Sequence, residues 1–444
     1  MLICSLYVPF MEHPTELSTL YIDFDAFFAT VEKQMRPELR GHAVGVMARE
    51  SEYSALIAQC YIAKALGCSR KMRVKEARKI CPEIKLVPAR HDVYVDMHHQ
   101  IIKCVQRSLP VEKVWSIDEV ECDITGFSEA QAISIAREIK ANLARDIGTE
   151  ISPSIGLAGN QLLAKICAEM EKPQSFVVLH PRSWPGKLLN VALSDVPGIA
   201  GGNIARLRRA GITSIAELLT IEAKHARAIW GNVEGERLWA QLQGYSVKRP
   251  PTTRNMFGHS RTLSAKWKRP DKALECLRLL TTKAARRLRS DGFWAQKITV
   301  SLRDENKQRY NVERRIPPSR DDFTFQREIT TAFSLLMQQK KHQQLRNISV
   351  MLHGLCRQGH ITDDLFTAHS HQESRQKHET LCDVMDKVNS RYGGTYLNIG
   401  QTPDIPGGYV GGKIAFGRVP SKEDFATSPP RKPQKLRPAE KTQD

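Results

Sequence analysis

YIDFDAFF at residues 21–28 and SIDE at residues 116–119 are the two stretches of this 444-residue chain that decide its fold. Each places acids, namely Asp23, Asp118 and Glu119, in or beside a short apolar, β-branched and aromatic run. An ionised carboxylate is costly in such surroundings unless something compensates its charge. Two strands that deliver acids of this kind indicate a site for hard divalent cations, with Mg²⁺ as the obvious candidate. Two such ions close together can clamp the attacking and leaving oxygens of a phosphoryl transfer.

The spacing of the acids leaves alternatives open when each stretch is taken alone. In a strand, Tyr21, Asp23 and Asp25 share one face, but this pattern is also typical of a cap or of a surface face. Asp118 and Glu119 would point to opposite sides of a straight strand, so both reach one ion only where the chain turns or twists sharply. By itself this pair also fits a helix N-terminus or a turn. Together, the two stretches favour a metal site.

Composition and charge narrow the class of protein. The length predicts about three or four domains, and contents of 41% hydrophobic and 26% charged residues are globular values. The net charge of +18 favours a polyanionic partner. The ten cysteines include no CxxC pair, which favours reduced thiols over disulfides or zinc sites. Because we find neither a signal peptide nor an apolar stretch long enough to cross a membrane, we expect a soluble cytoplasmic protein with no membrane partner.

Periodicity predicts helices and strands that alternate along the chain, which is typical of an α+β multidomain fold. The predicted elements are a strand entering a helix at 19–31, helices at 54–66, 74–80, 91–109 and 131–146, two strands within 111–125, and a strand at 151–157. Residues 186–250 are expected to be all-helical, and Pro250-Pro251 marks a linker. Past residue 356 the pattern weakens, and the Pro-, Lys- and Glu-rich tail at 419–444 is expected to be disordered.

The positive charge is concentrated between Arg254 and Val350, where 22 Lys and Arg residues stand against 9 Asp and Glu residues. The predicted elements of this segment are a helix at 271–289 and strand-like runs at 296–302 and 347–352. A solvated basic surface is one interpretation. We favour a compact basic domain that follows a phosphate backbone, because Lys and Arg contacts gain affinity by releasing counterions.

Four motifs follow one another along the chain: IDFDAFFATVE at 22–32, SIDEVECDIT at 116–125, SIGLAGNQLLAKICAEMEKP at 154–173 and VPGIAGGNIARLRRAGI at 196–212. In this order they resemble the signatures of Y-family translesion DNA polymerases, of the bacterial polymerase IV and polymerase V catalytic-subunit kind. The resemblance spans residues 19–355 and implies a right-hand polymerase. The implied domains are a palm (17–33 and 93–185), fingers (34–92), a helical thumb with a helix-hairpin-helix (186–250) and an α/β, DNA-binding little finger (251–355).

The resemblance implies a role for each acid. Asp23 and Asp118 match the acids that bridge two Mg²⁺ ions, and Glu119 matches the ligand of the ion that activates the primer 3′-hydroxyl. The backbone carbonyl of Phe24 matches a ligand of the ion that arrives with the nucleoside triphosphate. Ions in these places lower the pKa of the attacking hydroxyl and neutralise charge on the phosphates. Asp25 has no matching role, and we interpret it as structural.

Other matched residues face the incoming nucleotide. Phe28 stands where the family keeps a steric gate, an aromatic ring that would collide with the 2′-hydroxyl of a ribonucleotide. An ordinary core Phe is the alternative. Tyr61, Lys64 and Lys165 match residues that hold the triphosphate. The family commonly has Arg where Lys64 stands, and Lys lacks the bidentate fork of Arg, so weaker nucleotide binding is expected.

The remaining matches concern DNA. Gly198 lies in the hairpin Pro-Gly-Ile-Ala at 197–200, which resembles a helix-hairpin-helix whose backbone N–H groups bind phosphate without reading sequence. Side chains that could contact DNA phosphates, or simply face solvent, are Arg206, Arg208 and Arg209 of the thumb and Arg286 and Arg287 of the basic domain.

The implied C-terminal extension, residues 356–418, suggests protein partners. Ile-Thr-Asp-Asp-Leu-Phe at 361–366 resembles the peptide with which bacterial polymerases bind the sliding clamp, with Leu365 and Phe366 as the pair that the clamp buries. A loop with no partner is the alternative. Residues 379–418 resemble the extension of polymerase V catalytic subunits, so accessory subunits are further expected partners.

The implied function is template-directed, low-fidelity DNA synthesis during damage bypass, with primer–template DNA and deoxynucleoside triphosphates as substrates. The competing interpretation is a catalytically silent relative that binds DNA as a repair scaffold. Three costly acids argue against it. A two-metal cyclase would not explain the hairpin and the basic domain. Two departures from the family pattern remain. Lys71 stands where relatives keep a small residue that faces the templating base, which leaves the lesion preference open, and Gln161 stands where the family has a second lysine, which removes one charge.

Overall fold

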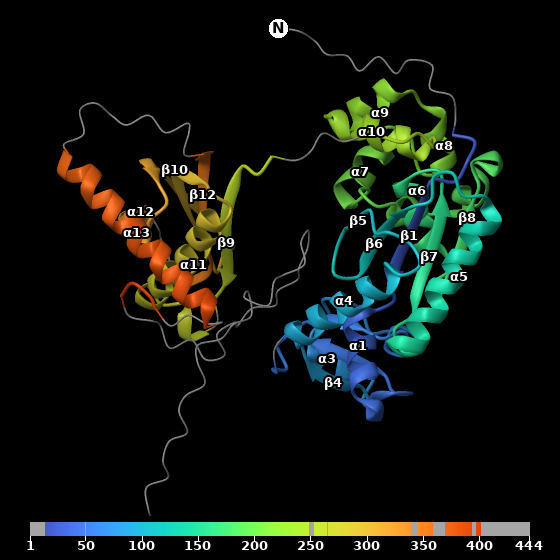
Figure 1. Ribbon diagram of the computed structural model, residues 1–444, viewed down its shortest axis with the longest axis horizontal. Helices are drawn as coiled ribbons and strands as arrows, with labels where there is room; N and C mark the ends of the chain where they lie inside the picture. The colour runs from blue at the N-terminus through green and yellow to red at the C-terminus, as the bar shows by residue number, and fades with distance from the viewer. Residues whose placement is uncertain are drawn as a thin grey trace, which may run out of the picture. The chain divides into compact units, whose positions relative to one another are not determined.

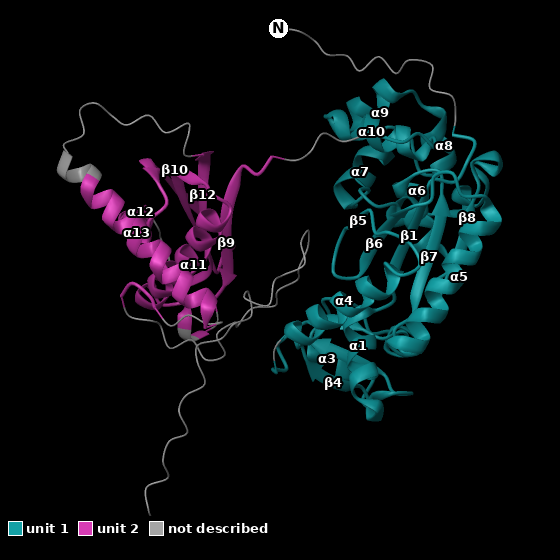
Figure 2. Cartoon of the chain, viewed as in Figure 1, with its two compact units in different colours: residues 1–250, 412–421 teal, residues 251–411, 422–444 magenta. Residues whose placement is uncertain are grey.

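The computed structural model of the chain describes residues 14–48, 50–247, 253–263, 265–339, 344–357, 369–392 and 397–400. These residues form two compact units, which divide between Pro250 and Pro251, where the sequence predicts a linker (Figure 1 and Figure 2). Both units combine sheets with helices, so the predicted α+β multidomain fold class is confirmed. None of the helices in the described part of the chain is long and apolar enough to span a membrane.

A five-stranded sheet in the order β5-β6-β1-β7-β8 forms the middle of the first unit. Its strands are β1 (Thr19–Phe24), β5 (Lys113–Val114), β6 (Glu119–Asp123), β7 (Pro153–Ala158) and β8 (Phe176–Leu179). Every residue of β1 is buried, as expected for a central strand of a covered sheet. The strands predicted near the start of the chain, within 111–125 and at 151–157 are confirmed.

Three longer helices belong to this sheet (Figure 1). They are α4 (His91–Val105), α5 (Glu129–Asp146) and α6 (Gln161–Met170), and the first two confirm predicted helices. The α6 helix packs on β1, β7 and β8. Gly156 of β7 permits this close approach, because a Cβ atom there would overlap the carbonyl oxygen of Ala164. The side chain of Asn160 caps α6 by accepting a 3.0 Å hydrogen bond from the backbone N–H of Leu163.

A smaller sheet in the order β3-β2-β4 lies next in the first unit. Its elements are α1 (Phe27–Met35), a 3₁₀ turn (Pro37–Leu39), β2 (Val44–Met47), β3 (Leu56–Gln59), α2 (Tyr61–Ala65), α3 (Val74–Ile80) and β4 (Lys85–Pro88). The predicted helix at 74–80 is confirmed. The predicted helix at 54–66 is wrong in its first half, because Leu56–Gln59 pairs with Val44–Met47 as a strand. A short apolar run fits a buried strand as well as a helix, and here strand pairing decides.

The last part of the first unit is helical, as predicted. It contains 3₁₀ turns at Pro181–Ser183, Gly186–Asn190 and Leu193–Asp195, then α7 (Gly201–Arg209), α8 (Ile215–Thr220), α9 (Ala223–Trp230) and α10 (Val233–Leu242). Leu207, Ile215 and Trp230 share one core cluster with Leu163 and Ile166 of α6. The helical part is therefore packed onto the helix that covers β1.

The second unit is an antiparallel sheet in the order β11-β10-β12-β9, with helices on one face. Its elements are β9 (Met256–Thr262), a 3₁₀ turn (Ala265–Trp267), α11 (Pro270–Ser290), β10 (Trp294–Asp304), β11 (Arg309–Ser319), α12 (Asp322–Gln339) and β12 (Leu345–Cys356). Ile298, Val300 and Val350 pack beneath α11 and α12 in the core of this unit. The helix and strands that the sequence predicts here are confirmed.

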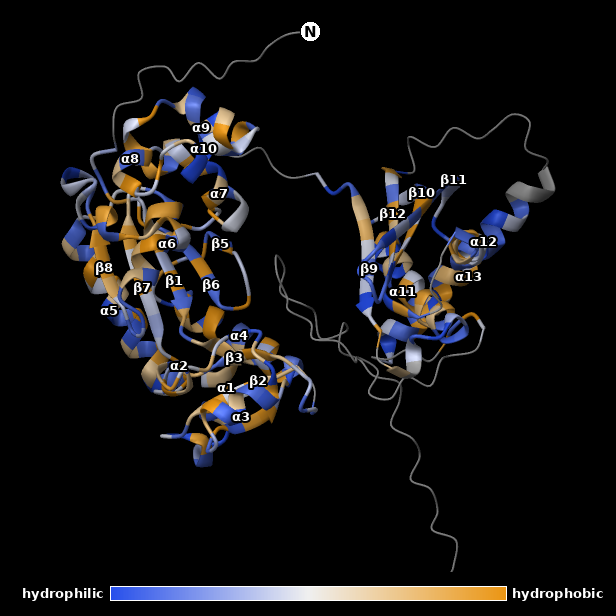
Figure 3. Ribbon diagram, turned by 180° about the vertical axis from the view of Figure 1, so that it is seen from behind, coloured by the Kyte–Doolittle hydropathy of each residue, from blue (hydrophilic) through white to orange (hydrophobic). Residues whose placement is uncertain are grey.

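A further helix, α13 (His369–Arg391), belongs to the second unit and contacts α12. The fading pattern past residue 356 does not predict it. The helix is mostly hydrophilic (Figure 3), and charged side chains fasten it. Arg289 of α11 donates to Asp386 at 2.6 Å, and the Arg320 side chain forms an ion pair with Asp383. The tail at 419–444 lies outside the described residues.

Candidate active site

The pairing of β1 with β6 brings two of the predicted acids together. Asp23 of β1 lies directly opposite Glu119 of β6 in the antiparallel register. The backbone N–H of Phe24 donates to the carbonyl oxygen of Asp118 at 2.8 Å, which extends the pairing beyond the first residue of β6. Residues opposite one another in an antiparallel pair lie on the same face of the sheet. Asp23 and Glu119 therefore share the face over which α6 packs.

In a straight strand, Asp118 and Glu119 would point to opposite faces of the sheet. Asp118, however, lies in a bend just before β6, where this alternation does not apply. Its carboxylate is hydrogen-bonded to the hydroxyl of Ser116, and its backbone N–H donates to that hydroxyl at 3.3 Å. Burial raises the pKa of Asp118, with the nearby charge of Glu119 adding to the shift. The turn that a shared metal site requires is thus present at Asp118.

The structure adds a third acid to the face of Asp23 and Glu119. Within the described residues, ligand oxygens of Asp23, Glu119 and Glu169 all lie within 4.8 Å of one another. Glu169 is on α6, one turn beyond Lys165, and no sequence pattern assigns it a role. Asp118 lies outside this trio, although its charge contributes to raising the pKa of Asp23. A set of carboxylate oxygens is the donor chemistry that hard divalent cations prefer, so these residues fit such an ion.

Two lysines lie among these acids. The Nζ atom of Lys172 lies 2.5 Å from Oδ1 of Asp23 and 2.9 Å from Oε1 of Glu169. The Nζ atom of Lys165 forms an ion pair with Glu119 and lies 3.5 Å from the hydroxyl oxygen of Tyr21. Lys165, which the resemblance assigns to the triphosphate, is thus on the metal-site acids here. Lys172 has no predicted role, although the spacing of Lys165, Glu169 and Lys172 at intervals of one helical turn is a signal that places them on one side.

Burial and the neighbouring charges act in opposite directions on the pKa values of this cluster. Burial raises the pKa of Asp23 well above the usual range, and the neighbouring ammonium of Lys172 offsets only part of that shift. For Lys172, burial lowers the pKa, but attraction to Asp23 and Glu169 outweighs it and the pKa is raised. For Glu169, burial opposes and Lys172 favours the charged form, and the pKa is lowered. The ammonium groups therefore favour the charged form of the acids in a buried place.

Phe28, the predicted steric gate, is half-buried and held by aromatic neighbours. Its ring stacks on Tyr94 with centroids 4.3 Å apart and planes 16° apart, and His91 meets it edge-on at 5.9 Å. The hydroxyl of Tyr94 donates to the buried carboxylate of Glu32 at 2.7 Å. The same carboxylate accepts two hydrogen bonds from Arg90, at 3.0 and 2.7 Å. Phe28 is partly exposed, whereas its neighbour Phe27 is core.

The predicted fingers residues lie near the same acids. The hydroxyl of Tyr61 lies 3.5 Å from Oδ1 of Asp25, and the Nζ atom of Lys64 lies 3.9 Å from the centre of the Tyr61 ring. Burial lowers the pKa of Lys64, and the charge of Lys172 adds to that effect. Asp25 accepts hydrogen bonds from the Ser154 hydroxyl and from the backbone N–H of Gln174, at 2.9 and 2.7 Å. These bonds tie Asp25 to the sheet.

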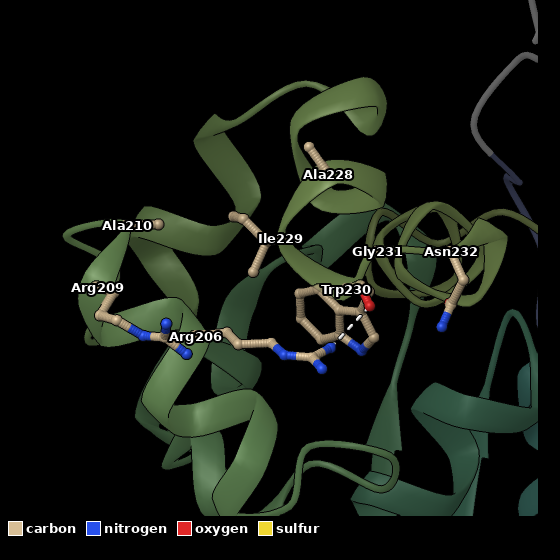
Figure 4. Close-up of a pocket in the computed structure, with 8 residues that line it drawn as sticks. All are labelled: Arg206, Arg209, Ala210, Ala228, Ile229, Trp230, Gly231 and Asn232. Carbon is tan, nitrogen blue, oxygen red and sulfur yellow. Dashed lines mark hydrogen bonds between the residues drawn. The ribbon is translucent and has the colours of Figure 1, made fainter.

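In the helical part of the first unit, Gly198 has the positive φ of 93° that the hairpin turn needs. Its carbonyl oxygen accepts a 3.0 Å hydrogen bond from the side chain of Asn203. Arg206 is exposed, and its Nη1 atom donates at 2.7 Å to the carbonyl oxygen of Trp230, the last residue of α9 (Figure 4). Arg209 extends along the edge of the same open pocket. Arg208 is exposed.

In the second unit, the predicted Arg286 and Arg287 face other elements of the protein. Arg286 donates to the Ser390 hydroxyl of α13 at 3.0 Å, and Arg287 donates to the carbonyl oxygen of Gly258 at 3.3 Å. The sheet face opposite the helices carries a different basic set. Strand register places Arg303 beside Arg309, and Lys297 beside Arg315, on the face that Val300 and Ile298 do not share. The alternation of residues along these strands is the feature of the sequence that could have indicated this basic face. Leu365 and Phe366 lie outside the described residues.

The sequence of this chain is similar to those of known proteins over most of its length. The sequence profile of the impB/mucB/samB family matches residues 22–169, and that of the impB/mucB/samB family C-terminal domain matches residues 254–365. The chain is 29% identical over 389 residues to the DNA polymerase IV of Moorella thermoacetica, which covers 85% of this chain and 94% of that protein. It is 24% identical to the DNA polymerase IV 1 of Halalkalibacterium halodurans, over 87% of this chain and 93% of that one.

Solved structures agree on the fold. A Y-family DNA polymerase chimera of Dbh and Dpo4 superposes with a TM-score of 0.66 at 23% identity, covering 77% of this chain and 99% of the chimera. An insertion ternary complex of Dbh DNA polymerase gives a TM-score of 0.53 with the same coverage. At this level of identity the likeness concerns the fold. The α13 helix lies beyond the segment that the C-terminal family profile matches.

Proposed function

Since this chain belongs to the impB/mucB/samB family of Y-family DNA polymerases, we propose that Asp23, Asp118 and Glu119 carry its template-directed nucleotidyl transfer. The enzyme is a translesion DNA polymerase and, like its family, depends on divalent metal. What we add is the assignment of residues to steps, the identity of the metal as Mg²⁺ and the use of two ions. The observation that carries the assignment is the register of β1 and β6, which sets Asp23 opposite Glu119 beside the bend at Asp118.

Under this proposal, Asp23 and Asp118 would hold both ions, Glu119 would hold the ion at the primer end, and the Phe24 carbonyl would contribute to the ion at the nucleotide. The ions supply a lowered pKa of the primer 3′-hydroxyl and positive charge for the phosphates. Carboxylates fixed by strand pairing need no reorganisation as charge develops, which favours the transition state. Asp23 is buried, and a carboxylate in such surroundings acts more strongly on nearby charge than one in water.

Three side chains around the acids, one tyrosine and two lysines, would serve the triphosphate. Tyr61, Lys64 and Lys165 come from two different elements, α2 and α6, and all lie near the acids. Lys165 forms an ion pair with Glu119, and its ammonium would be free for the triphosphate once that acid holds an ion. The ammonium of a lysine is a compact charge on a flexible stem, which suits such a change of partner.

Phe28 would act as the steric gate. Its ring is supported from one side by Tyr94, which Glu32 holds by a 2.7 Å hydrogen bond, so it cannot easily yield to a 2′-hydroxyl. Discrimination by a supported ring rests on collision, because a rigid group penalises the larger sugar. Deoxynucleoside triphosphates are therefore the proposed substrates.

Primer–template DNA would contact positive surfaces of each unit. In the first unit, these are the hairpin at Gly198 and the exposed Arg208 and Arg209. In the second unit, they are the basic residues of the sheet face opposite the helices, such as Arg303 and Arg309. We favour these residues over Arg286 and Arg287. A sliding clamp bound through 362–366, accessory subunits and action in the cytoplasm are further parts of the proposal that come from the sequence alone.

The test is primer extension by the purified full chain with Mg²⁺, next to an Asp118→Ala variant. We expect extension by the wild type, loss of extension in the variant and unchanged binding of primer–template DNA by both. A DNA-binding scaffold with no catalysis predicts binding without extension in both proteins, and that result would overturn the proposal. Extension that survives Asp118→Ala would leave a polymerase but reject the assignment of Asp118.

A further inference from the structure

An ammonium group already occupies the acid cluster. Lys172 lies directly after α6, and its Nζ atom contacts Asp23 at 2.5 Å and Glu169 at 2.9 Å. The two acids differ in their surroundings, because the Asp23 side chain is only 9% exposed and that of Glu169 is 41% exposed. Lys172 therefore bridges from the buried metal-site acid to an acid at the edge of the cluster.

The cluster needs such a cation. Three carboxylates with oxygens within 4.8 Å repel one another strongly in a place of low dielectric. Lys165 serves Glu119, and Lys172 serves both Asp23 and Glu169. These ammonium groups offset that repulsion through the ion pairs present in the structure.

The same ammonium must conflict with a divalent ion. An ion on Asp23 would lie within a few ångströms of the Lys172 Nζ atom, and like charges at such distances repel strongly when they are buried. The flexible stem of a lysine lets the ammonium move, and Glu169 offers it a second partner on the more exposed side. The path away from Asp23 is thus part of the contact already present.

We propose that Lys172 is a resident counter-ion of the metal site, displaced from Asp23 when a divalent ion binds and retained at the edge of the site by Glu169. This inference rests on the proposed function, because it takes Asp23 as a metal ligand. Lys172 keeps the acids ordered before metal binding and lowers the affinity of the free enzyme for metal. Glu169 limits that loss by accepting the displaced ammonium. Lys172 and Glu169 are positioning residues in this account.

The first test measures Mn²⁺ binding by the full chain without DNA or nucleotide, from the paramagnetic resonance signal of free Mn²⁺. Lys172→Met removes the competing charge, and we expect Mn²⁺ to bind about tenfold more tightly. Lys187→Met is the matched control, because Lys187, in the 3₁₀ turn Gly186–Asn190, also pairs with an acid but is exposed, with its Nζ atom 3.0 Å from Glu171. Unchanged or weaker binding in a folded Lys172→Met variant would overturn the proposal.

Glu169 gives a second, independent arm. Glu169→Gln leaves Lys172 with Asp23 as its main partner, so Mn²⁺ should bind more weakly than to the wild type. Adding Lys172→Met to Glu169→Gln should restore binding to at least the wild-type level. If Glu169 is instead an ordinary metal ligand, the double variant stays as weak as Glu169→Gln, and the proposed role of Glu169 fails.

A measurement on the wild type covers the case in which the variants do not fold. Acetylation of lysines by an amine-reactive reagent, read by mass spectrometry, should become faster at Lys172 when Mn²⁺ is added, while Lys187 reacts at a constant rate. No change at Lys172 under saturating Mn²⁺ would overturn the displacement. Failure of Mn²⁺ to bind, or binding that survives Asp23→Asn, would instead reject the proposed metal site itself.

Discussion

Each unit of this protein buries a small group of opposite charges, and the two groups use different cations. In the first unit, the ammonium of Lys172 sits between Asp23 and Glu169, with the Glu169 side of the group exposed. In the second unit, the guanidinium of Arg289 sits between Asp322 and Asp386, and the Arg289 and Asp322 side chains are both 3% exposed.

The geometry of the contacts explains what each group does. Arg289 donates from all three of its nitrogens, to both aspartates and, at 2.8 Å, to the carbonyl oxygen of Arg320. It thereby joins α11, α12 and α13 with a planar fork whose nitrogens are all bonded. Lys172 makes point contacts that another cation can replace. Buried charge is structural in the second unit and exchangeable in the first.

The largest expected effect on stability comes from breaking the fixed group. Arg289→Met leaves the buried carboxylate of Asp322 without its arginine and Asp386 with only the more distant Arg286, and should lower the free energy of unfolding of the second unit by about 3–5 kcal/mol. Arg327→Met is the control, because its side chain is 72% exposed and its ion pair with Glu328 should contribute little. Calorimetry of the full chain reads both, and equal losses in the two variants would show that Arg289 is not a fastening.

The next effect concerns the aromatic group beside the exchangeable charges. Phe28→Ala should raise incorporation of ribonucleotides relative to deoxynucleotides by about 10- to 100-fold, as expected when a steric block is removed. Phe27→Leu changes a buried neighbour and should cost stability without changing sugar preference. The readout is the ratio of the two kcat/KM values in primer extension. A constant ratio in Phe28→Ala would make Phe28 an ordinary core residue.

A smaller effect separates the two faces of the second unit. Changing Arg303 and Arg309 together to Gln should weaken DNA binding and reduce the slope of log K against log salt by about 2, because each arginine that neutralises a phosphate adds about one to that slope. The matched pair Arg286→Gln and Arg287→Gln should leave the slope unchanged, because these side chains bond to Ser390 and Gly258. A larger fall in slope for the second pair would return the DNA to the helical side.

The smallest expected effect is at the support of Phe28. Tyr94→Phe keeps the stacked ring and removes the hydrogen bond to Glu32, so sugar discrimination should fall by about 2- to 5-fold. Glu32→Gln keeps an acceptor for the Tyr94 hydroxyl, so sugar discrimination should change little. The free energy of unfolding should fall, because Arg90 loses its charged partner. Full discrimination in Tyr94→Phe, measured as above, would mean that stacking alone holds Phe28.

The sequence predicts most of what depends on local pattern. The strands that carry the acids, helices such as α3, α4 and α5 of the first unit, and α11, β10 and β12 of the second unit follow from periodicity and turn residues. The start of the predicted helix at 54–66 fails, because a short buried run takes its state from the strand it pairs with. The α13 helix is missed because few of its apolar residues are buried, namely Cys382 and Met385, and because distant partners such as Arg289 hold it by ion pairs.

The site shows the same limit. In the sequence, Lys172 and Glu169 resemble ordinary charged residues that face solvent. Only their position beside Asp23 in the structure indicates a role for them. Arg206 has the sequence of a phosphate contact, yet it donates to the Trp230 carbonyl. In each case the deciding partner is far away in the chain. Charge type is legible in a sequence, whereas the partner of a charge is not.

The central claim is that the chemistry depends on the particular acids of the first unit whose lysine partner a metal ion can replace. Negative charge elsewhere in the same unit is not sufficient. Glu119 and Glu121 test it most directly, because both belong to β6 and differ in partner. Glu119 forms an ion pair with Lys165 and lies opposite Asp23 in the strand register, whereas Glu121 accepts a 2.7 Å hydrogen bond from the Trp115 indole. Single-turnover nucleotide addition with Mg²⁺ should slow by about 10³-fold or more in Glu119→Gln and by less than about tenfold in Glu121→Gln. Equal losses in the two variants would contradict the account.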